Sequence, residues 1–314
     1  MPLVSARTKL ATVSALTALG AFASMGTATA AAPELNGGWA PSTRCPVDAP
    51  AMLAVDGLDR APQCVASFSL SGSIKLGKTT VNTGKTNLQM GVVQNADGTS
   101  TVVAPPAGAL IADSATVPGG LLGLMCPSDI PFITSICKQL SDGKLNKITA
   151  TMESAGSPSD FDQIAGVLTD QPIVTLPVRI RLENPFLGSN CYIGTKEKPI
   201  LLRPRNFTAP EFGLDRFSND GTPNEEGDIS RINLLGSTQG DNTFAVPGAS
   251  GCGLGLLGLI DGAVNLKTGL PSPAGKNSLV LNNTQTYLTG LYAPGVVAPD
   301  AGKVFSQSWH SAVK

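Results

Sequence analysis

The sequence predicts an all-β or β-rich fold, an antiparallel β-sandwich or an open barrel with two or three short helices, as one compact unit from about residue 40 to 290. Residues 174–182 and 65–76 alternate apolar and polar side chains, which is the period of a strand with one buried face. Charged residues make up 14% of the chain, against about 25% in typical globular proteins, and the 35 glycines and 24 prolines favour turns over long helices.

The clearest predicted strand runs from Val174 to Leu182. Its apolar face consists of Val174, Leu176, Val178, Ile180 and Leu182, and its other face of Thr175, Pro177, Arg179 and Arg181. Asn184-Pro185 and Gly188 then predict a turn, because proline cannot donate to a strand ladder and glycine accepts turn dihedrals. The chain returns at Cys191-Tyr192-Ile193, so we expect a long hairpin with a cysteine at the start of its second strand.

Residues 65–104 contain the second region of strand pattern. The residues that fall on one face are Phe68, Leu70, Gly72, Ile74 and Leu76. Asn95-Ala96-Asp97-Gly98 has the composition of a hairpin turn, and Pro105-Pro106 ends the strand that follows it. We therefore expect consecutive antiparallel strands over 65–104.

Shorter elements and one long loop fill the rest of the chain. The predicted elements are a short helix from Ser128 to Gly143, two helical turns at 160–168 with Phe161, Ile164 and Leu168 inward, and strands at 199–203 and 279–288. Residues 204–242 are polar and contain Asn219-Asp220-Gly221 and a run of acidic residues. This composition predicts a long polar surface loop.

The first thirty residues have the three parts of a secretory signal peptide. Arg7 and Lys9 give a positive start, residues 10–26 are apolar and uncharged, and Ala28-Thr29-Ala30 fits the small-x-small cleavage rule. Ser, Thr and Gly dilute the apolar stretch, which makes it a poor membrane anchor. We expect cleavage near Ala30, a secreted mature chain and no transmembrane anchor.

The mature chain is then divided by its composition. We expect an irregular N-terminal segment at 31–64, a single β-rich domain at 65–290 and a C-terminal tail at 291–314. Removing Arg7 and Lys9 leaves 20 basic residues against 23 acidic ones, a net charge of −3. A chain so nearly balanced offers no basic surface to nucleic acid, so we expect no nucleic-acid partner.

Six cysteines lie in the mature chain, and an even number in an exported protein predicts disulfides. Fifteen pairings are possible for six cysteines. We expect sequential pairing: Cys45–Cys64, Cys126–Cys137 and Cys191–Cys252. The chain has no Cys-x-x-Cys and a single histidine, His310, so the spacing does not favour a zinc site.

No catalytic residue can be assigned from the sequence. A serine hydrolase needs a serine beside a base, and His310 lies four residues from the end, where we expect a frayed terminus. A glycosidase needs two carboxylates instead. The candidates are Glu153, Asp160, Asp162, Glu183, Glu211, Asp215, Glu225, Glu226 and Asp228. Two tryptophans and three tyrosines give few platforms for sugar rings, so solvated surface carboxylates are the favoured interpretation.

Two ligand hypotheses remain open. Asp220, Glu225, Glu226 and Asp228 are weak candidates for calcium, because oxygen ligands on a loop suit that ion, although their spacing does not fit an EF-hand. The apolar segments 119–125 and 253–264 are candidates for lining a lipid pocket. Glycine at three- to four-residue spacing in both also suits close packing against a sheet, which is the favoured alternative. We expect no cofactor.

The segment Leu182–Gly194, with its hairpin turn and cysteine, resembles a family of uncharacterised secreted proteins from high-GC Gram-positive (actinobacterial) bacteria. The family has no assigned activity, so the resemblance implies export and adds nothing on mechanism. From the residues alone we expect a secreted, non-catalytic protein that binds a ligand or serves a structural role at or outside the cell envelope. A carboxylate-based polysaccharide hydrolase and a small lipid-binding protein are the alternatives.

Overall fold

A computed structural model describes residues 33–57, 60–126, 134, 143–253, 258–292 and 299–314. The predicted signal peptide, with its cleavage site near Ala30, lies outside the described residues, as does most of the helix predicted to begin at Ser128. The described residues belong to one compact unit.

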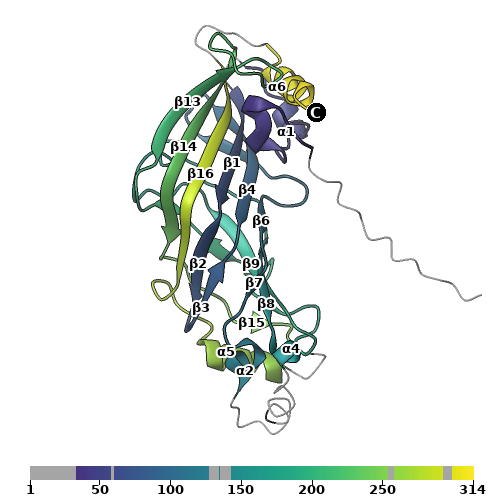
Figure 1. The fold of residues 1–314 in the computed structure, drawn as a ribbon, viewed down its shortest axis with the longest axis vertical. Helices are drawn as coiled ribbons and strands as arrows, with labels where there is room; N and C mark the ends of the chain where they lie inside the picture. Colours follow the sequence, from purple (N-terminus) through teal and green to yellow (C-terminus); the bar gives the residue numbers. More distant parts are fainter. Residues whose placement is uncertain (1–32, 58–59, 127–133, 135–142, 254–257, 293–298) are drawn as a thin grey trace, which may run out of the picture. The chain divides into compact units, whose positions relative to one another are not determined.

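The strands of the described residues form one antiparallel sheet (Figure 1). They are β1 (Arg60–Ser69), β2 (Ser71–Leu76), β3 (Thr79–Thr83), β4 (Thr86–Asn95), β5 (Ser100–Val103), β6 (Leu110–Ala112), β7 (Ala115–Thr116), β8 (Thr149–Ser154), β9 (Leu176–Glu183), β10 (Tyr192–Ile193), β11 (Ile200–Leu202), β12 (Arg205–Asn206), β13 (Glu211–Phe217), β14 (Ile229–Asp241), β15 (Ala249–Ser250) and β16 (Ser278–Tyr292). The order across the sheet is β12-β14-β16-β1-β4-β6-β8-β9-β10-β15, and β13 also pairs with β14. The sheet is open, and the prediction of an antiparallel β-rich fold is confirmed.

Helices cover the two ends of this sheet. The described ones are the 3-10 helix η1 (Gly37–Ser42) and the α-helices α1 (Pro50–Leu53), α2 (Gly120–Met125), α4 (Gly143–Asn146), α5 (Leu259–Thr268) and α6 (Ala301–Ser311), which exceeds the two or three predicted. In Figure 1, α2, α4 and α5 lie at one end and α1 and α6 at the other. No helix in the described ranges combines the length and the apolar character needed to cross a bilayer.

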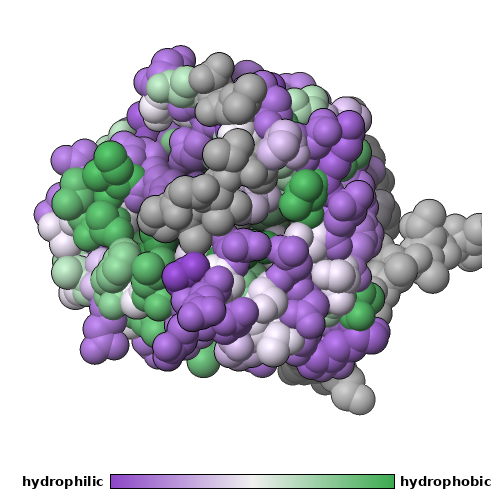
Figure 2. Space-filling model, turned by 90° about the horizontal axis from the view of Figure 1, so that it is seen from above, coloured by the Kyte–Doolittle hydropathy of each residue, from purple (hydrophilic) through white to green (hydrophobic). Residues whose placement is uncertain are grey.

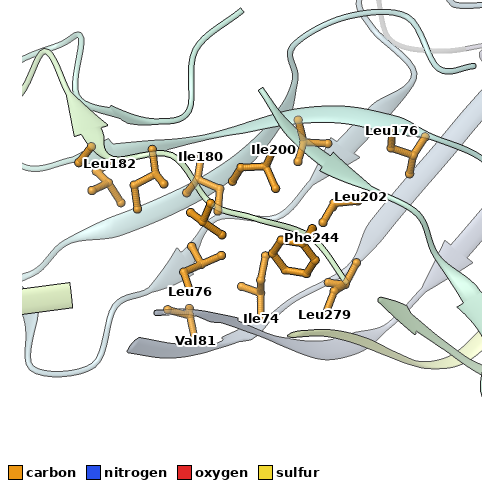
Figure 3. Packing of buried hydrophobic residues seen from close by; sticks show 14 of the residues in the cluster. Ile74, Leu76, Val81, Leu176, Ile180, Leu182, Ile200, Leu202, Phe244 and Leu279 are labelled. Carbon is orange, nitrogen blue, oxygen red and sulfur yellow. The ribbon is translucent and has the colours of Figure 1, made fainter. Parts of the chain in front are cut away.

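The main hydrophobic core lies between two layers of the bent sheet. In Figure 3, apolar side chains of β9 and β11 face those of β2, β3 and β16, with Phe244 between them. The five apolar residues predicted for the strand at 174–182 are all buried, from 8% exposed at Leu176 to 1% at Val178. The alternation is therefore confirmed, and burial of this face supplies much of the drive to fold.

The predicted hairpin and two predicted disulfides are confirmed. β10 pairs with β9, with Tyr192 opposite Arg181, and also with β15. Cys191 and Cys252, just before β10 and just after β15, form a disulfide, and Cys45 forms another with Cys64 of β1. The third predicted pair, Cys126–Cys137, includes Cys137, which lies outside the described residues.

A second hydrophobic core fills the end of the sheet near α1 and α6. Trp39 of η1 is fully buried and meets the rings of Phe217 and Phe305 edge to face, at centroid distances of 5.8 and 5.1 Å. The Trp39 Nε1–H donates to the carbonyl of Asn219, and the Trp309 Nε1–H to the carbonyl of Ser42, both at 2.9 Å. This core therefore joins the N-terminal segment, the β13 end and the C-terminal helix.

The prediction of a long loop at 204–242 is wrong. This segment forms β12, β13 and β14, and β14 pairs along its length with β16. The alternation of apolar and polar residues along β14 is hard to see in the sequence, because its pairing with β16 changes register at three points. One of them lies around Gly236, whose φ is +77°. Several polar residues of β14 are buried and bond to neighbouring segments: the Ser237 hydroxyl bonds to that of Thr284, and Gln239 Nε2 donates to Oδ1 of Asn206. A polar composition here therefore does not mean a loop.

The expected tail at 291–314 and the irregular segment at 31–64 are also more ordered than predicted. α6 buries Ala301, Phe305 and Trp309, which recur every four residues along one helix face. β1 begins at Arg60, inside the segment expected to be irregular, and η1 and α1 precede it. Lys314 N–H donates to the carbonyl of Glu34, so the two ends of the described chain are paired.

Two smaller predictions fail where the chain bends. Leu70 is 63% exposed, because β1 ends at Ser69 and β2 starts at Ser71, so the predicted continuous strand is interrupted there. Residues 163–167 form turns rather than a helix, and Ile164 and Leu168 are 69% and 46% exposed although they were predicted to point inward. Only Phe161 of that predicted stripe is buried.

Candidate functional site

Most of the carboxylates proposed for a glycosidase lie apart from one another, and Asp160 and Asp162 border a common groove. Glu153 pairs with Arg179 at 3.0 Å and with Arg181 at 3.4 Å, and Glu183 also pairs with Arg181. All four lie on the polar face of β8 and β9, away from the core. Because each carboxylate is held by a cation of its own strand or the next, this cluster is a set of cross-strand ion pairs.

The acids at 160–162 close local turns. Asp160 has a left-handed backbone, φ 52°, and its carboxylate accepts a hydrogen bond from the Ser159 hydroxyl at 2.9 Å. That hydrogen bond is the main reason why the pKa of Asp160 lies below its ordinary value. Asp162 accepts from the backbone N–H groups of Ile164 and Ala165. A glycosidase acid needs a raised pKa, so Asp160 is shifted in the wrong direction for that role.

The only histidine is ordered, contrary to the expected fraying. His310 lies on α6, and its Nε2 is 2.9 Å from Oδ2 of Asp48, while the Ser306 hydroxyl donates to Oδ1 of Asp48 at 2.6 Å. In a hydrolytic triad the histidine stands between serine and aspartate. Here the aspartate stands between the other two residues. The Ser306 hydroxyl donates to the Asp48 carboxylate and not to His310, so the histidine is not placed to act as a base on that hydroxyl.

The Asp48 cluster gives a pH-dependent contribution to stability. The Ser306 hydrogen bond, and to a smaller extent His310, hold the pKa of Asp48 below its ordinary value. Its contribution is therefore present above pH about 4, the unfolded value, and is lost as the pH falls through the lower folded value. We expect Asp48→Asn to cost under about 1 kcal/mol at pH 7, because the Asp48 and His310 side chains are both more than half exposed, and to cost less at pH 3.

Thermal unfolding of the wild type and the Asp48→Asn variant from pH 3 to 7 measures this. Ser306→Ala is the matched control, because it removes the hydrogen bond that contributes most to the lowered pKa of Asp48. It should make the contribution of Asp48 to stability depend less on pH. A difference in stability between the wild type and Asp48→Asn that stays constant from pH 3 to 7 would contradict a lowered pKa of Asp48 in the folded protein.

The four calcium candidates do not form a metal site. The carboxylate of Asp220 accepts from the backbone N–H of Thr222, and Glu225, Glu226 and Asp228 are exposed in the turn between β13 and β14. Within the described residues, no group of three or more His, Cys, Asp or Glu side chains is arranged to hold a metal ion. The structure therefore gives the calcium hypothesis no support.

The described parts of the two segments considered for a lipid pocket are packed at the end of the sheet, and residues 254–257 lie outside the described residues. Leu121 and Leu124 of α2 are buried, as are Ile260 and Val264 of α5. A small cavity of about 50 Å³ lies between the layers beside Leu124, lined mainly by apolar side chains. It has room for only a few atoms, so these segments act chiefly as packing, as the alternative interpretation held.

A much larger groove, of about 780 Å³, lies between β14, β16, the β4–β5 turn and the segment 160–167. Ile232 and Leu234 of β14 and Leu288 of β16 form its floor, and Leu288 pairs directly with Ile232. Phe161, Ile164 and Val167 form one wall. We call this set the apolar groove. Its volume lies in the range of about 300–1,000 Å³ that is usual for ligand sites.

Amide and hydroxyl groups line the other wall of the apolar groove. Gln163 Oε1 accepts from Gln94 Nε2 at 3.1 Å, and Gln94 Oε1 accepts from the Ser100 hydroxyl at 3.0 Å. Thr99 and Gly98 of the β4–β5 turn complete this side. Asp160 and Asp162 also line the groove, so apolar and polar residues contribute about equally to it. Apolar side chains combined with polar groups that can orient a ligand are the usual composition of a binding site.

The apolar surface continues from the groove onto β13. Phe212 and Leu214 pair with Leu234 and Ile232, and directly opposed residues of an antiparallel pair share one face, so both belong to the groove side of the sheet. They are 64% and 56% exposed, and Val167 in the facing wall is 39% exposed. Figure 2 shows hydrophobic residues grouped on the side of the molecule where β13 lies. Exposed apolar residues gathered in this way mark interaction sites.

The sequence did not reveal this site. Ile232, Leu234, Phe212 and Leu214 fall in the segment predicted to be a loop, yet each pair shows the two-residue spacing of a strand face. A search for short alternations inside polar segments would have found them. The other groove residues come from distant parts of the chain, so no local motif contains them.

Comparison with known proteins adds no relative: no family model, no curated protein and no solved structure matches this chain.

Proposed function

We propose that the protein is a secreted, non-catalytic binding protein that takes an apolar ligand in the apolar groove. The observation that carries this proposal is the groove itself, about 780 Å³ in volume, with exposed Ile164 and Val167 beside a floor of Ile232, Leu234 and Leu288. Leaving Ile164 and Val167 exposed to water is unfavourable by about 25 cal/mol per Å² of apolar surface, which a bound apolar ligand recovers.

Catalysis is less well supported than binding. Asp160 and Asp162 both line the groove, but each carboxylate accepts hydrogen bonds that close its own turn. Ser306 and His310 both bond to Asp48, at the α6 end of the molecule. A polysaccharide hydrolase would need two free carboxylates in one cleft, and the small cavity beside Leu124 offers little space for a lipid.

Secretion is the compartment that fits this proposal. Disulfides such as Cys45–Cys64 and Cys191–Cys252 persist in oxidising surroundings outside the cytosol. The signal-like residues 1–30 and the resemblance of 182–194 to actinobacterial secreted proteins point the same way. The ligand is thus one found at or outside the cell envelope.

The groove is tested with a neutral fluorescent probe, N-phenyl-1-naphthylamine, whose emission rises in apolar sites. We expect Ile164→Lys to weaken probe binding by at least about tenfold, because a charged ammonium placed in an apolar lining resists desolvation. Ile164 is 69% exposed, so the change should leave the fold intact. Equilibrium titration gives the Kd, and circular dichroism checks the fold.

Leu266→Lys is the matched control, since Leu266 of α5 is 82% exposed and lies outside the apolar groove. It should bind the probe as the wild type does. Equal binding by Ile164→Lys and the wild type, or equal loss in both variants, would refute the groove as the binding site.

A further inference from the structure

The outer edge of β13 has free backbone hydrogen-bonding groups beside the apolar groove. The carbonyl of Arg216 accepts from the N–H of Asn224 at 3.1 Å, so the backbone of Arg216 points away from β14. Backbone direction alternates along an antiparallel strand, so the N–H and C=O groups of Phe212 and Leu214 also point away from β14. No group in the described ranges bonds to them.

The chain itself shows how a strand pairs on this edge. Residues 222–224 run antiparallel to the end of β13, with Pro223 opposite Phe217 and Ser218 N–H donating to the carbonyl of Thr222. The segment then turns away at Glu225, which leaves the edge from Glu211 to Asp215 uncovered. Protein sheets usually protect such an edge, because it pairs readily with another chain.

Charge around this edge favours a basic partner. Six acidic residues lie on β13 or in the turn after it: Glu211, Asp215, Asp220, Glu225, Glu226 and Asp228. Two arginines oppose them, which leaves an excess of four negative charges. Both are engaged, since Arg216 donates to the carbonyl of Gly227 and Arg231 pairs with Asp215 at 2.6 Å.

The same charges disfavour a second copy of this chain. A symmetric antiparallel pair of β13 strands that uses the free groups of Phe212 and Leu214 is centred on Gly213. It places Glu211 of one copy opposite Asp215 of the other, on the same face. Like charges directly opposite each other destabilise a strand pair.

We propose that the edge of β13 binds an extended peptide that alternates apolar and basic residues and adds to the sheet as a further antiparallel strand. This rests on the proposed function, because the apolar side chains of the peptide would lie beside Phe212 and Leu214 and extend the apolar surface that begins in the apolar groove. Its basic side chains would lie on the other face, beside Glu211 and Asp215. Its amino terminus would adjoin Asn224, next to the acidic turn.

The free edge sets the length of the peptide. Five residues from Glu211 to Asp215 span about 17 Å at 3.4 Å per residue, so a peptide of about five to seven residues fills it. Main-chain hydrogen bonds would supply affinity, and the alternation of side chains would supply specificity.

The decisive experiment changes one backbone group. Leu214→Pro removes the outward N–H and keeps an apolar side chain, and proline is tolerated where a strand N–H faces solvent. Leu214→Val is the matched control, because it keeps the N–H. With a capped seven-residue peptide of alternating valine and lysine, we expect the Kd for Leu214→Pro to be about tenfold weaker than for Leu214→Val, by loss of one hydrogen bond. Replacing lysine by glutamate in the peptide should weaken binding by at least as much.

The outcomes separate the two proposals. N-phenyl-1-naphthylamine should bind equally to Leu214→Pro and Leu214→Val, which also shows that both variants are folded. Equal peptide binding by the two variants, or no binding of the lysine peptide to the wild type, overturns strand addition; the groove stands if Ile164→Lys still loses the probe. A wild-type dimer that Leu214→Pro converts to monomer, in sedimentation, would make a second copy the occupant and overturn the peptide proposal.

Discussion

The Trp39→Ala variant is expected to lose about 3–5 kcal/mol of unfolding free energy, the usual cost of truncating a large buried aromatic side chain. Trp39 is fully buried between Phe217 of β13 and Phe305 of α6, so its removal leaves a cavity where three parts of the chain meet. It also leaves the carbonyl of Asn219 without its indole donor. Most domains are stable by only about 5–15 kcal/mol, so the variant should be close to unfolding.

Urea unfolding followed by circular dichroism measures this loss. Trp39→Phe is the control, because it keeps an aromatic ring against Phe217 and Phe305 but cannot donate to Asn219. It should lose clearly less stability than Trp39→Ala. A loss below about 1 kcal/mol for the alanine variant would mean that the second core contributes little to folding.

The double variant Cys191→Ser/Cys252→Ser is expected to lose about 4 kcal/mol. The disulfide closes a loop with a sequence separation of 61 residues. In the chain-entropy picture, removing it increases the conformational entropy of the unfolded chain and so stabilises the unfolded state by about 4 kcal/mol. The loop contains β10 to β15, so the bond restrains part of the main sheet and not merely a surface loop. The melting temperature, compared with that of the oxidised wild type, measures the effect.

The Cys45–Cys64 pair provides a matched comparison. Its sequence separation is 19, so the same relation gives about 3 kcal/mol, roughly 1 kcal/mol less. We expect Cys45→Ser/Cys64→Ser to melt above the Cys191→Ser/Cys252→Ser variant. The reverse order would show that native-state packing around Cys45, and not loop length, decides the contribution of these bonds.

Protease sensitivity is a second readout for the Cys191–Cys252 bond. A mobile loop at 204–242 would be cut first once the bond is removed. Since β14 pairs with both β13 and β16, we expect that segment to resist until the whole molecule unfolds.

Regular alternation made much of the fold predictable. Val174 to Leu182 alternates without a break, because one strand face is buried from end to end. β14 follows the same rule only in parts, since its register shifts at three points and its outer face carries Arg231 and Asn233. The helix α6 had a readable signal in Ala301, Phe305 and Trp309, which its position near the chain end obscured.

The apolar groove was beyond what the sequence could predict. Gln94, Ile164, Ile232 and Leu288 line it together, although they come from four separate segments. Ile164 was predicted to be buried because isoleucine at helical spacing usually packs inward, whereas here it is exposed in a turn. The two correct disulfides were predicted by pairing the cysteines in sequence order, a rule that uses no information about the sheet.

The pairing of the first long strand with the last has a consequence for synthesis. β1 lies between β4 and β16, so its second neighbour is made only after residue 278. Trp39 likewise waits for Phe305 before its core can close. A growing chain can form the β1–β4 hairpin early, but it cannot complete either hydrophobic core until almost the whole sequence has left the ribosome. Such a chain stays unfolded for longer during synthesis, which suits the proposed secretion, because a narrow export channel admits an unfolded chain.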